Sequence, residues 1–123
     1  MRIPDDNITD LTDLYEMCEN DVNSVRQMLR LFLISVPEDV NALNEAFKNQ
    51  DFIGIKHISH RLESSVNLFN IETVKNEVRA IKNYAHEQEN IQMISELIPY
   101  ITTTLRKATI EIEKKLEKLN EQN

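Results

Sequence analysis

The feature that most constrains this chain is a three-and-four spacing of apolar residues, which recurs along five stretches of the sequence. That period places apolar side chains on one face of an α-helix and does not suit the alternation of a half-buried strand. The 123 residues include one glycine and three prolines, whereas folds with many tight turns need more glycine. The five stretches cover residues 8–18, 21–49, 51–70, 71–85 and 94–119. We therefore expect an all-α fold: an antiparallel four-helix bundle with an additional short N-terminal helix that caps one end.

Local residues predict where the helices begin and end. Asp51 is the expected N-cap of the third helix, and Asn70 is expected to end it because asparagine accepts a left-handed backbone. The apolar stripe of the second stretch continues in phase across Pro37, so we expect one long kinked helix there rather than two helices. Pro99 either kinks the last helix or marks its first turn. Candidate N-caps of the first helix are Asn7, Thr9 and Asp10.

Length and charge narrow the class of protein. The chain suits one domain over residues 1–123, with a core from about residue 8 to 119. Its formal net charge of −7 argues against nucleic acid and an anionic membrane surface as partners. Cys18 is the one cysteine and cannot form an internal disulfide, which fits a reducing compartment and a place in the core. No stretch resembles a signal peptide or a membrane span, so we expect a cytoplasmic protein.

His60 differs from the core positions of its helix because it faces away from the apolar side. On a helical wheel, Lys56, His60, Glu63 and Asn67 cluster opposite the apolar face. That apolar face consists of Ile55, Ile58, Leu62, Val66 and Phe69. An exposed imidazole is mostly neutral at pH 7 and has one ring nitrogen free to attack, so it suits a phosphoryl acceptor. Periodicity alone still favours an ordinary surface histidine.

The residues around His60 carry a family resemblance. Residues 59–65 read Ser-His-Arg-Leu-Glu-Ser-Ser, and Asn70 stands ten residues after the histidine. This stretch resembles the phosphorylation motif of histidine-containing phosphotransfer (HPt) domains, roughly Ala-His-x-Leu-Lys-Gly-Ser with a second glycine ten residues after the histidine. The similarity extends over about residues 8–119. Outside the motif it includes Leu31-Phe32-Leu33, Pro37-Glu38, Leu43, Ala46, Asp51, the opening run from Leu11 to Glu19, and Asp21.

The resemblance implies a phosphorelay intermediate that carries a phosphoryl group on His60 between the aspartates of receiver domains. Its partners would be response-regulator receiver domains and a hybrid sensor histidine kinase, and it would act as a monomer. It would be a phosphocarrier rather than an enzyme in the ordinary sense. No cofactor is expected on this chain, because the receiver brings the catalytic groups and Mg²⁺.

Three positions depart from the HPt pattern. Glu63 stands where the family has a lysine thought to steady the phosphoryl group, and a carboxylate about 5 Å away would oppose that group by on the order of 1–2 kcal/mol. We expect Lys56 and Arg61 to offset part of this repulsion, unless Lys56 pairs with Glu63 instead. Ser64 replaces the first glycine; it is small enough to admit a receiver and could donate a hydrogen bond to the imidazole or to the phosphoryl oxygens. Asn70 replaces the second glycine, which is a mild change for the backbone.

Receiver domains meet HPt domains through an apolar patch around the histidine. By resemblance, we expect such a docking patch on the first helix and the early second helix. The candidates are Ile8, Leu11, Leu14, Met28 and Leu31. The competing interpretation is that these side chains only plug the end of the bundle.

Two alternatives remain open from the sequence. An HPt-like scaffold or adaptor would bind a receiver or a helical partner without efficient phosphotransfer. The heptad-like stripe from Ile94 to Ile112 could serve such a partner or pack inside its own bundle. A metal site would need His57, His60 and Glu63 on one ion, but their directions spread over roughly 120° of the helical wheel. We therefore expect no bound metal.

Overall fold

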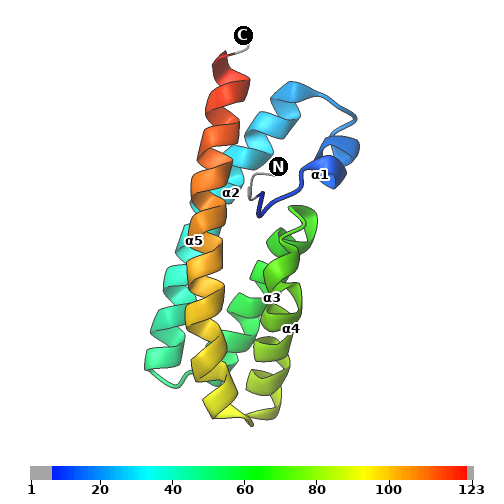
Figure 1. Cartoon of the computed structure of the whole chain (residues 1–123). Coiled ribbons are helices and arrows are strands. Elements are labelled where there is room, and N and C mark those ends of the chain that lie inside the picture. Colours follow the sequence, from blue (N-terminus) through cyan, green and yellow to red (C-terminus); the bar gives the residue numbers. More distant parts are fainter. Residues whose placement is uncertain (1–6, 122–123) are drawn as a thin grey trace, which may run out of the picture.

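The computed structural model describes residues 7–121, which contain five helices. They are α1 (Thr12–Met17), α2 (Val22–Lys48), α3 (Phe52–Leu68), α4 (Glu72–Glu87) and α5 (Ile91–Glu121). Figure 1 shows α2 to α5 alternating in direction, joined by short turns, with α1 at the end of the bundle where α2 begins. Within the bundle, α2 and α4 each pack on both α3 and α5. The expected all-α bundle with a short N-terminal helix is confirmed.

The core forms where the apolar faces of the four long helices meet. Fully buried side chains come from every one of these helices, so the core runs along the bundle. They include Leu29 and Leu43 on α2, Ile55 and Leu62 on α3, Ile81 on α4, and Ile101 and Leu105 on α5. The stripe from Ile94 to Ile112 is buried in this same core. That face of α5 is therefore not available to a partner helix.

Aspartate side chains cap the two helices that lead to the site. Asp21 accepts hydrogen bonds from the backbone N–H of Ser24 at 3.2 Å and from its hydroxyl at 2.6 Å. Asp51 accepts one from the backbone N–H of Gly54 at 2.9 Å. A Cβ added at Gly54 would come within 2.5 Å of an Asp51 carboxylate oxygen, so the cap and the glycine fit each other. Asn70 follows α3 with a φ of 51°, the left-handed conformation predicted for it.

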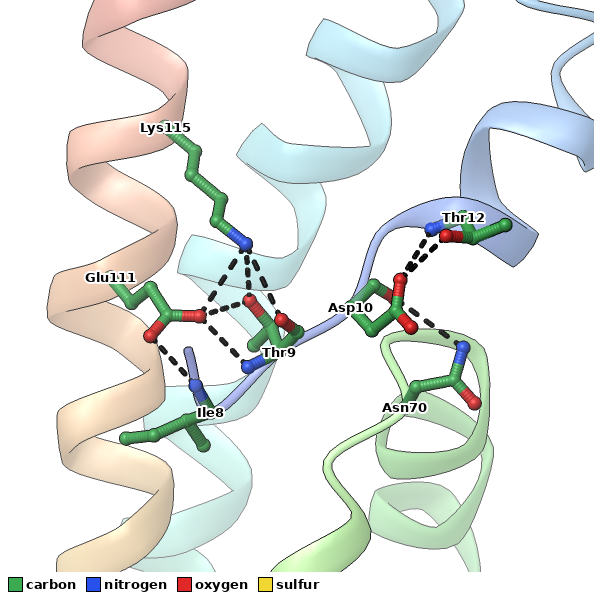
Figure 2. A network of polar contacts seen from close by, with 7 residues as sticks. All are labelled: Ile8, Thr9, Asp10, Thr12, Asn70, Glu111 and Lys115. Atoms are coloured by element: carbon green, nitrogen blue, oxygen red, sulfur yellow. Dashed lines mark hydrogen bonds and ion pairs between the residues drawn. The ribbon is translucent and has the colours of Figure 1, made fainter. Parts of the chain in front are cut away.

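The first helix is shorter than the sequence predicts. It begins only at Thr12, and residues 7–11 form a non-helical segment that we call the N-terminal strap. The backbone N–H groups of Ile8 and Thr9 each donate to the carboxylate of Glu111 at 2.8 Å (Figure 2). The apolar spacing at Ile8 thus reflects packing against the core, and α1 (Thr12–Met17) covers only the later part of the periodic stretch 8–18.

Further bonds tie the N-terminal strap to both sides of the bundle end. Lys115 on α5 donates to the hydroxyl of Thr9 at 2.8 Å. On the other side, Asn70 after α3 donates to the backbone carbonyl of Asp10 at 3.3 Å. Asp10 accepts a hydrogen bond from the backbone N–H of Thr12 at 3.0 Å (Figure 2). The N-cap of α1 is nevertheless Leu11, which makes no side-chain cap hydrogen bond, so the prediction of an N-cap at Asn7, Thr9 or Asp10 is wrong. The strap thus links the last helix to the turn after α3.

Both prolines within the bundle lie inside long helices. Pro37 lies inside a continuous α2, so the prediction of one helix across it is confirmed. Pro99 lies inside α5 and not in its first turn. Cys18 is half-buried and packs against the core. Among the described residues, no helix is both long and apolar enough to cross a lipid bilayer.

Candidate functional site

His60 lies near the middle of α3 on the side that faces solvent. Its side chain is 73% exposed, whereas Ile58, Ser59 and Leu62 beside it are buried. These buried neighbours hold the helix against the bundle, so the imidazole is presented on a rigid element. The prediction that His60 faces outward is confirmed.

Glu63 lies one turn after His60 and is directed toward α4. Its Oε1 accepts a hydrogen bond from Nζ of Lys82 at 2.7 Å, and its Oε2 lies 3.4 Å from Nε of Arg79. The hydrogen bond from Lys82 is the main cause of a lowered pKa at Glu63, and it outweighs the opposing effect of burial. The same Oε1 lies 3.8 Å from Nδ1 of His60, which is an electrostatic contact rather than a hydrogen bond.

These contacts change the electrostatics expected at the site. The sequence predicts an unpaired Glu63 that repels a phosphoryl group, or one that pairs with Lys56. Instead, the packing of α3 on α4 brings two cations, Lys82 and Arg79, to one carboxylate. The expectation of an unpaired carboxylate is therefore wrong, and this group of three side chains carries an excess of positive charge next to His60.

A basic cavity of about 380 Å³ lies between α3 and α4 and includes the phosphoryl acceptor candidate in its wall. We call it the α3–α4 cavity. Its lining consists of Lys56, His57, His60, Lys82, Asn83 and His86. The last three come from α4, and sequence reasoning missed them because it had no means of knowing which side of the fourth helix meets the third. His86 also lies beyond the predicted end of that helix, yet within α4. Its three-and-four spacing from Lys82 and Asn83 was the available signal.

Other residues predicted to support His60 have different surroundings. The guanidinium of Arg61 donates to Asp39 on α2 at 2.9 Å and 3.2 Å, so this cation is already paired away from Glu63. Within the described residues Arg61 makes no ion pair with Glu63, so its compensation of that charge stays a prediction. Asn67 is exposed. Ser64 is also exposed, and among the described residues it makes no hydrogen bond to His60.

An apolar groove of about 210 Å³ lies between α2 and α3, and we call it the α2–α3 groove. Its lining consists of Met28, Leu31, Phe32, Ser35, Ser64, Ser65, Leu68 and Phe69. The ring centroids of Phe32 and Phe69 are 4.4 Å apart, and both residues are buried, so they form the floor of the groove. Leu31 is 52% exposed. Because Ser64 lies one turn beyond His60, the groove begins close to the histidine.

The structure divides the five predicted docking residues into two groups. Met28 and Leu31 line the α2–α3 groove. Leu14 is fully buried in the core, so its prediction as an exposed docking residue is wrong. Ile8 and Leu11 belong to the N-terminal strap and are partly buried against the core. For these three, closing the end of the bundle is the role that the packing shows.

The histidines of α3 and α4 do not belong to a cluster of metal ligands among the described residues. Within residues 7–121, no three or more His, Cys, Asp or Glu side chains are placed to hold one metal ion. His57 and His60 share the α3–α4 cavity with His86, but their neighbours there are lysines and an asparagine.

Comparison with known proteins assigns the family. The family model of the Hpt domain matches residues 27–122, which run from within α2 through α5 and include His60 and both lysines of the α3–α4 cavity. Searches of curated proteins and of solved structures found no match. Since the match covers most of the chain and the bundle has the expected architecture, this chain belongs to the Hpt domain family.

Proposed function

We propose that this chain is a phosphorelay intermediate that carries a phosphoryl group on His60 between the aspartates of receiver domains. Membership of the Hpt domain family supports a role in histidine phosphotransfer. The observation that carries the proposal is the position of His60. Its imidazole is 73% exposed on a rigid helix, in the wall of the α3–α4 cavity and one turn from the α2–α3 groove.

The chemistry requires one aligned nucleophile from this chain. Nδ1 of His60 lies on the side of Glu63, so the lone pair on the other ring nitrogen, Nε2, is the one that we assign to the attack. That lone pair forms the N–P bond while the P–O bond to the receiver aspartate breaks, and the aspartate leaves as a carboxylate. The imidazole gains positive charge in this step, and the neighbouring carboxylate of Glu63 stabilises it. The reverse step passes the phosphoryl group to the aspartate of a second receiver.

The division of labour makes this chain a carrier and not an enzyme. The receiver would supply Mg²⁺ and the groups that polarise the phosphoryl oxygens, so this chain needs no cofactor. We propose that the receiver docks over the α2–α3 groove, because the exposed Leu31 and the half-buried Met28 offer it an apolar contact surface near His60. The proposed partners are response-regulator receivers and a hybrid sensor histidine kinase, with the chain acting as a monomer in the cytoplasm.

An HPt-like scaffold is the second candidate function. It is favoured by Glu63 at the position of the family's lysine, since a cation on α3 is missing there. Such a scaffold would bind receivers over the same groove without efficient phosphotransfer.

One experiment separates the two functions. The purified chain is incubated with a phosphorylated receiver and Mg²⁺, and acid-labile, base-stable label on the chain is measured. His60→Gln is compared with His57→Gln, because both residues are exposed histidines on α3 that line the same cavity. Label on the wild type and His57→Gln, but not on His60→Gln, is the expected result. Binding of several receivers without any label would support the scaffold instead.

A further inference from the structure

We propose that Lys82 on α4 supplies the cation that holds the phosphoryl group on His60, in place of the lysine that the family carries on α3. The inference rests on the proposed function and specifies which residue completes its site. It concerns a phosphoryl-binding residue contributed by a different helix.

The geometry places Lys82 next to the acceptor. Its Nζ is 2.7 Å from the same Glu63 oxygen, Oε1, that lies 3.8 Å from Nδ1 of His60. Both Lys82 and His60 line the α3–α4 cavity, whose volume of about 380 Å³ leaves room for a phosphoryl group. The ammonium has three donors and, within residues 7–121, bonds to Glu63 alone, so further donors remain for phosphoryl oxygens.

The Glu63 carboxylate has a second cationic partner besides Lys82. Its other oxygen, Oε2, lies 3.4 Å from Nε of Arg79, so the carboxylate keeps a cationic partner if Lys82 turns toward a phosphoryl group. A phosphoryl group carries between one and two negative charges at neutral pH, and its attraction for the ammonium competes well with a carboxylate that already has a second partner.

The other cations near His60 fit the role less well. Arg61 is paired with Asp39 on α2. Arg79 is 55% exposed and does not line the α3–α4 cavity. Lys56 lines the cavity, but it has no contact that ties it to Glu63 and hence to the position of the imidazole. Among the cations of the described residues, only Lys82 combines a place in the cavity wall with an ion pair to Glu63.

The test uses variants matched in their surroundings. Lys82→Gln removes the charge and keeps a hydrogen-bonding side chain. The control is Lys75→Gln, because Lys75 lies on the same helix, is likewise 24% exposed and likewise forms a 2.7 Å pair with a glutamate, Glu72. Lys82→Arg keeps the charge and should retain the activity. Each protein is phosphorylated both by a phosphorylated receiver and by phosphoramidate, a small reagent that needs no docking surface.

The readouts are the half-life of the phosphohistidine and the equilibrium of transfer from the receiver. We expect Lys82→Gln to shorten the half-life and to shift the equilibrium away from His60, each by about fivefold, as for the loss of one charge-assisted hydrogen bond at a partly exposed site. Lys75→Gln should match the wild type in both readouts, and Lys82→Arg should restore most of what Lys82→Gln loses. Circular dichroism should show the same helical fold in every variant, and both readouts are taken well below the lowest thermal midpoint.

The outcomes distinguish this inference from the proposed function. If the wild type is labelled on His60 and Lys82→Gln behaves like the wild type in both readouts, Lys82 does not hold the phosphoryl group and the carrier function stands. If receivers bind but label neither the wild type nor any variant, the carrier function fails and this inference fails with it. A defect shared equally by Lys82→Gln and Lys75→Gln would also overturn the inference, since it would reflect helix stability.

Discussion

Glu63 on α3 and Lys82 on α4 form an ion pair of 2.7 Å, and the carboxylate oxygen in that pair is also the one that faces His60. The two side chains are 15% and 24% exposed, so the pair is partly shielded from water. It joins the helix that bears the acceptor to the helix that lines the other side of the α3–α4 cavity. Both the stability of this helix pair and the charge near His60 therefore depend on it.

Glu63→Gln should destabilise the fold by about 0.5–1 kcal/mol at neutral pH, because it leaves Lys82 and Arg79 without their carboxylate. The pKa of Glu63 is lowered in the folded state, mainly by the hydrogen bond from Lys82. The carboxylate thus adds stability above its unfolded pKa and loses that contribution as the pH falls through the lowered folded value. Urea unfolding should show the full difference at about pH 7, and the difference should shrink as the pH falls below the ordinary pKa of a glutamate.

Glu72→Gln is the matched control for that measurement. Glu72 pairs with Lys75 at the same 2.7 Å, but its side chain is 71% exposed. Its removal should change the free energy of unfolding by less than about 0.5 kcal/mol at either pH. Equal losses from the two substitutions would contradict the special place assigned to Glu63.

The N-terminal strap should loosen when Glu111 loses its charge. Burial would raise the pKa of Glu111, but hydrogen bonds from Thr9 and Ile8 outweigh it and lower the pKa. Glu111→Gln replaces one acceptor oxygen with a donor, and we expect a loss of about 1–2 kcal/mol. Hydrogen exchange at the Ile8 and Thr9 amides should accelerate, and in the wild type this protection should fall as the pH drops through the lowered pKa of Glu111.

Glu113→Gln provides the comparison on α5, because Glu113 is exposed and two residues away from Glu111. It should leave both amides protected. Fast exchange in the wild type at neutral pH would show that the strap is not held as these bonds require.

Gly54→Ala should fail to stabilise α3, although alanine is the better helix former by about 0.5–1 kcal/mol. The new Cβ would meet an oxygen of the Asp51 carboxylate at 2.5 Å, so the Asp51 side chain must shift and its present hydrogen bond to Gly54 is weakened. Loss of a cap costs about 0.5–2 kcal/mol, which offsets the gain in propensity. In an Asp51→Ala background the same substitution should stabilise, and a double-mutant cycle in urea unfolding measures the coupling. Additive effects would mean that glycine is not required by the cap.

Leu31→Glu should weaken receiver binding by about tenfold, because it places a charge in the apolar α2–α3 groove. Ile34→Glu is the control: Ile34 is on the same helix, is 61% exposed and does not line the groove. Binding is measured by titration of a fluorescently labelled receiver. If both substitutions weaken binding equally, or if only Ile34→Glu weakens it, the receiver docks on another part of α2.

The sequence alone was sufficient for the helices, for most of their boundaries and for the exposed histidine. Helical periodicity, aspartate caps and the left-handed preference of asparagine each depend on residues a few positions apart. They can therefore be recognised in the sequence alone. The position of His60 opposite Ile55, Ile58 and Leu62 follows from the same geometry and is confirmed by their burial. The motif around it indicated the family that the family model then matched.

Only the tertiary structure decided which partners these side chains meet. Glu63 pairs with Lys82 and Arg79, at least sixteen residues away along the chain, and Arg61 pairs with Asp39 on α2. The N-terminal strap is held by Glu111, about a hundred residues further on. Such contacts depend on how the rigid helices are rotated and shifted against one another as they bury their apolar faces, and local periodicity contains no information about that choice.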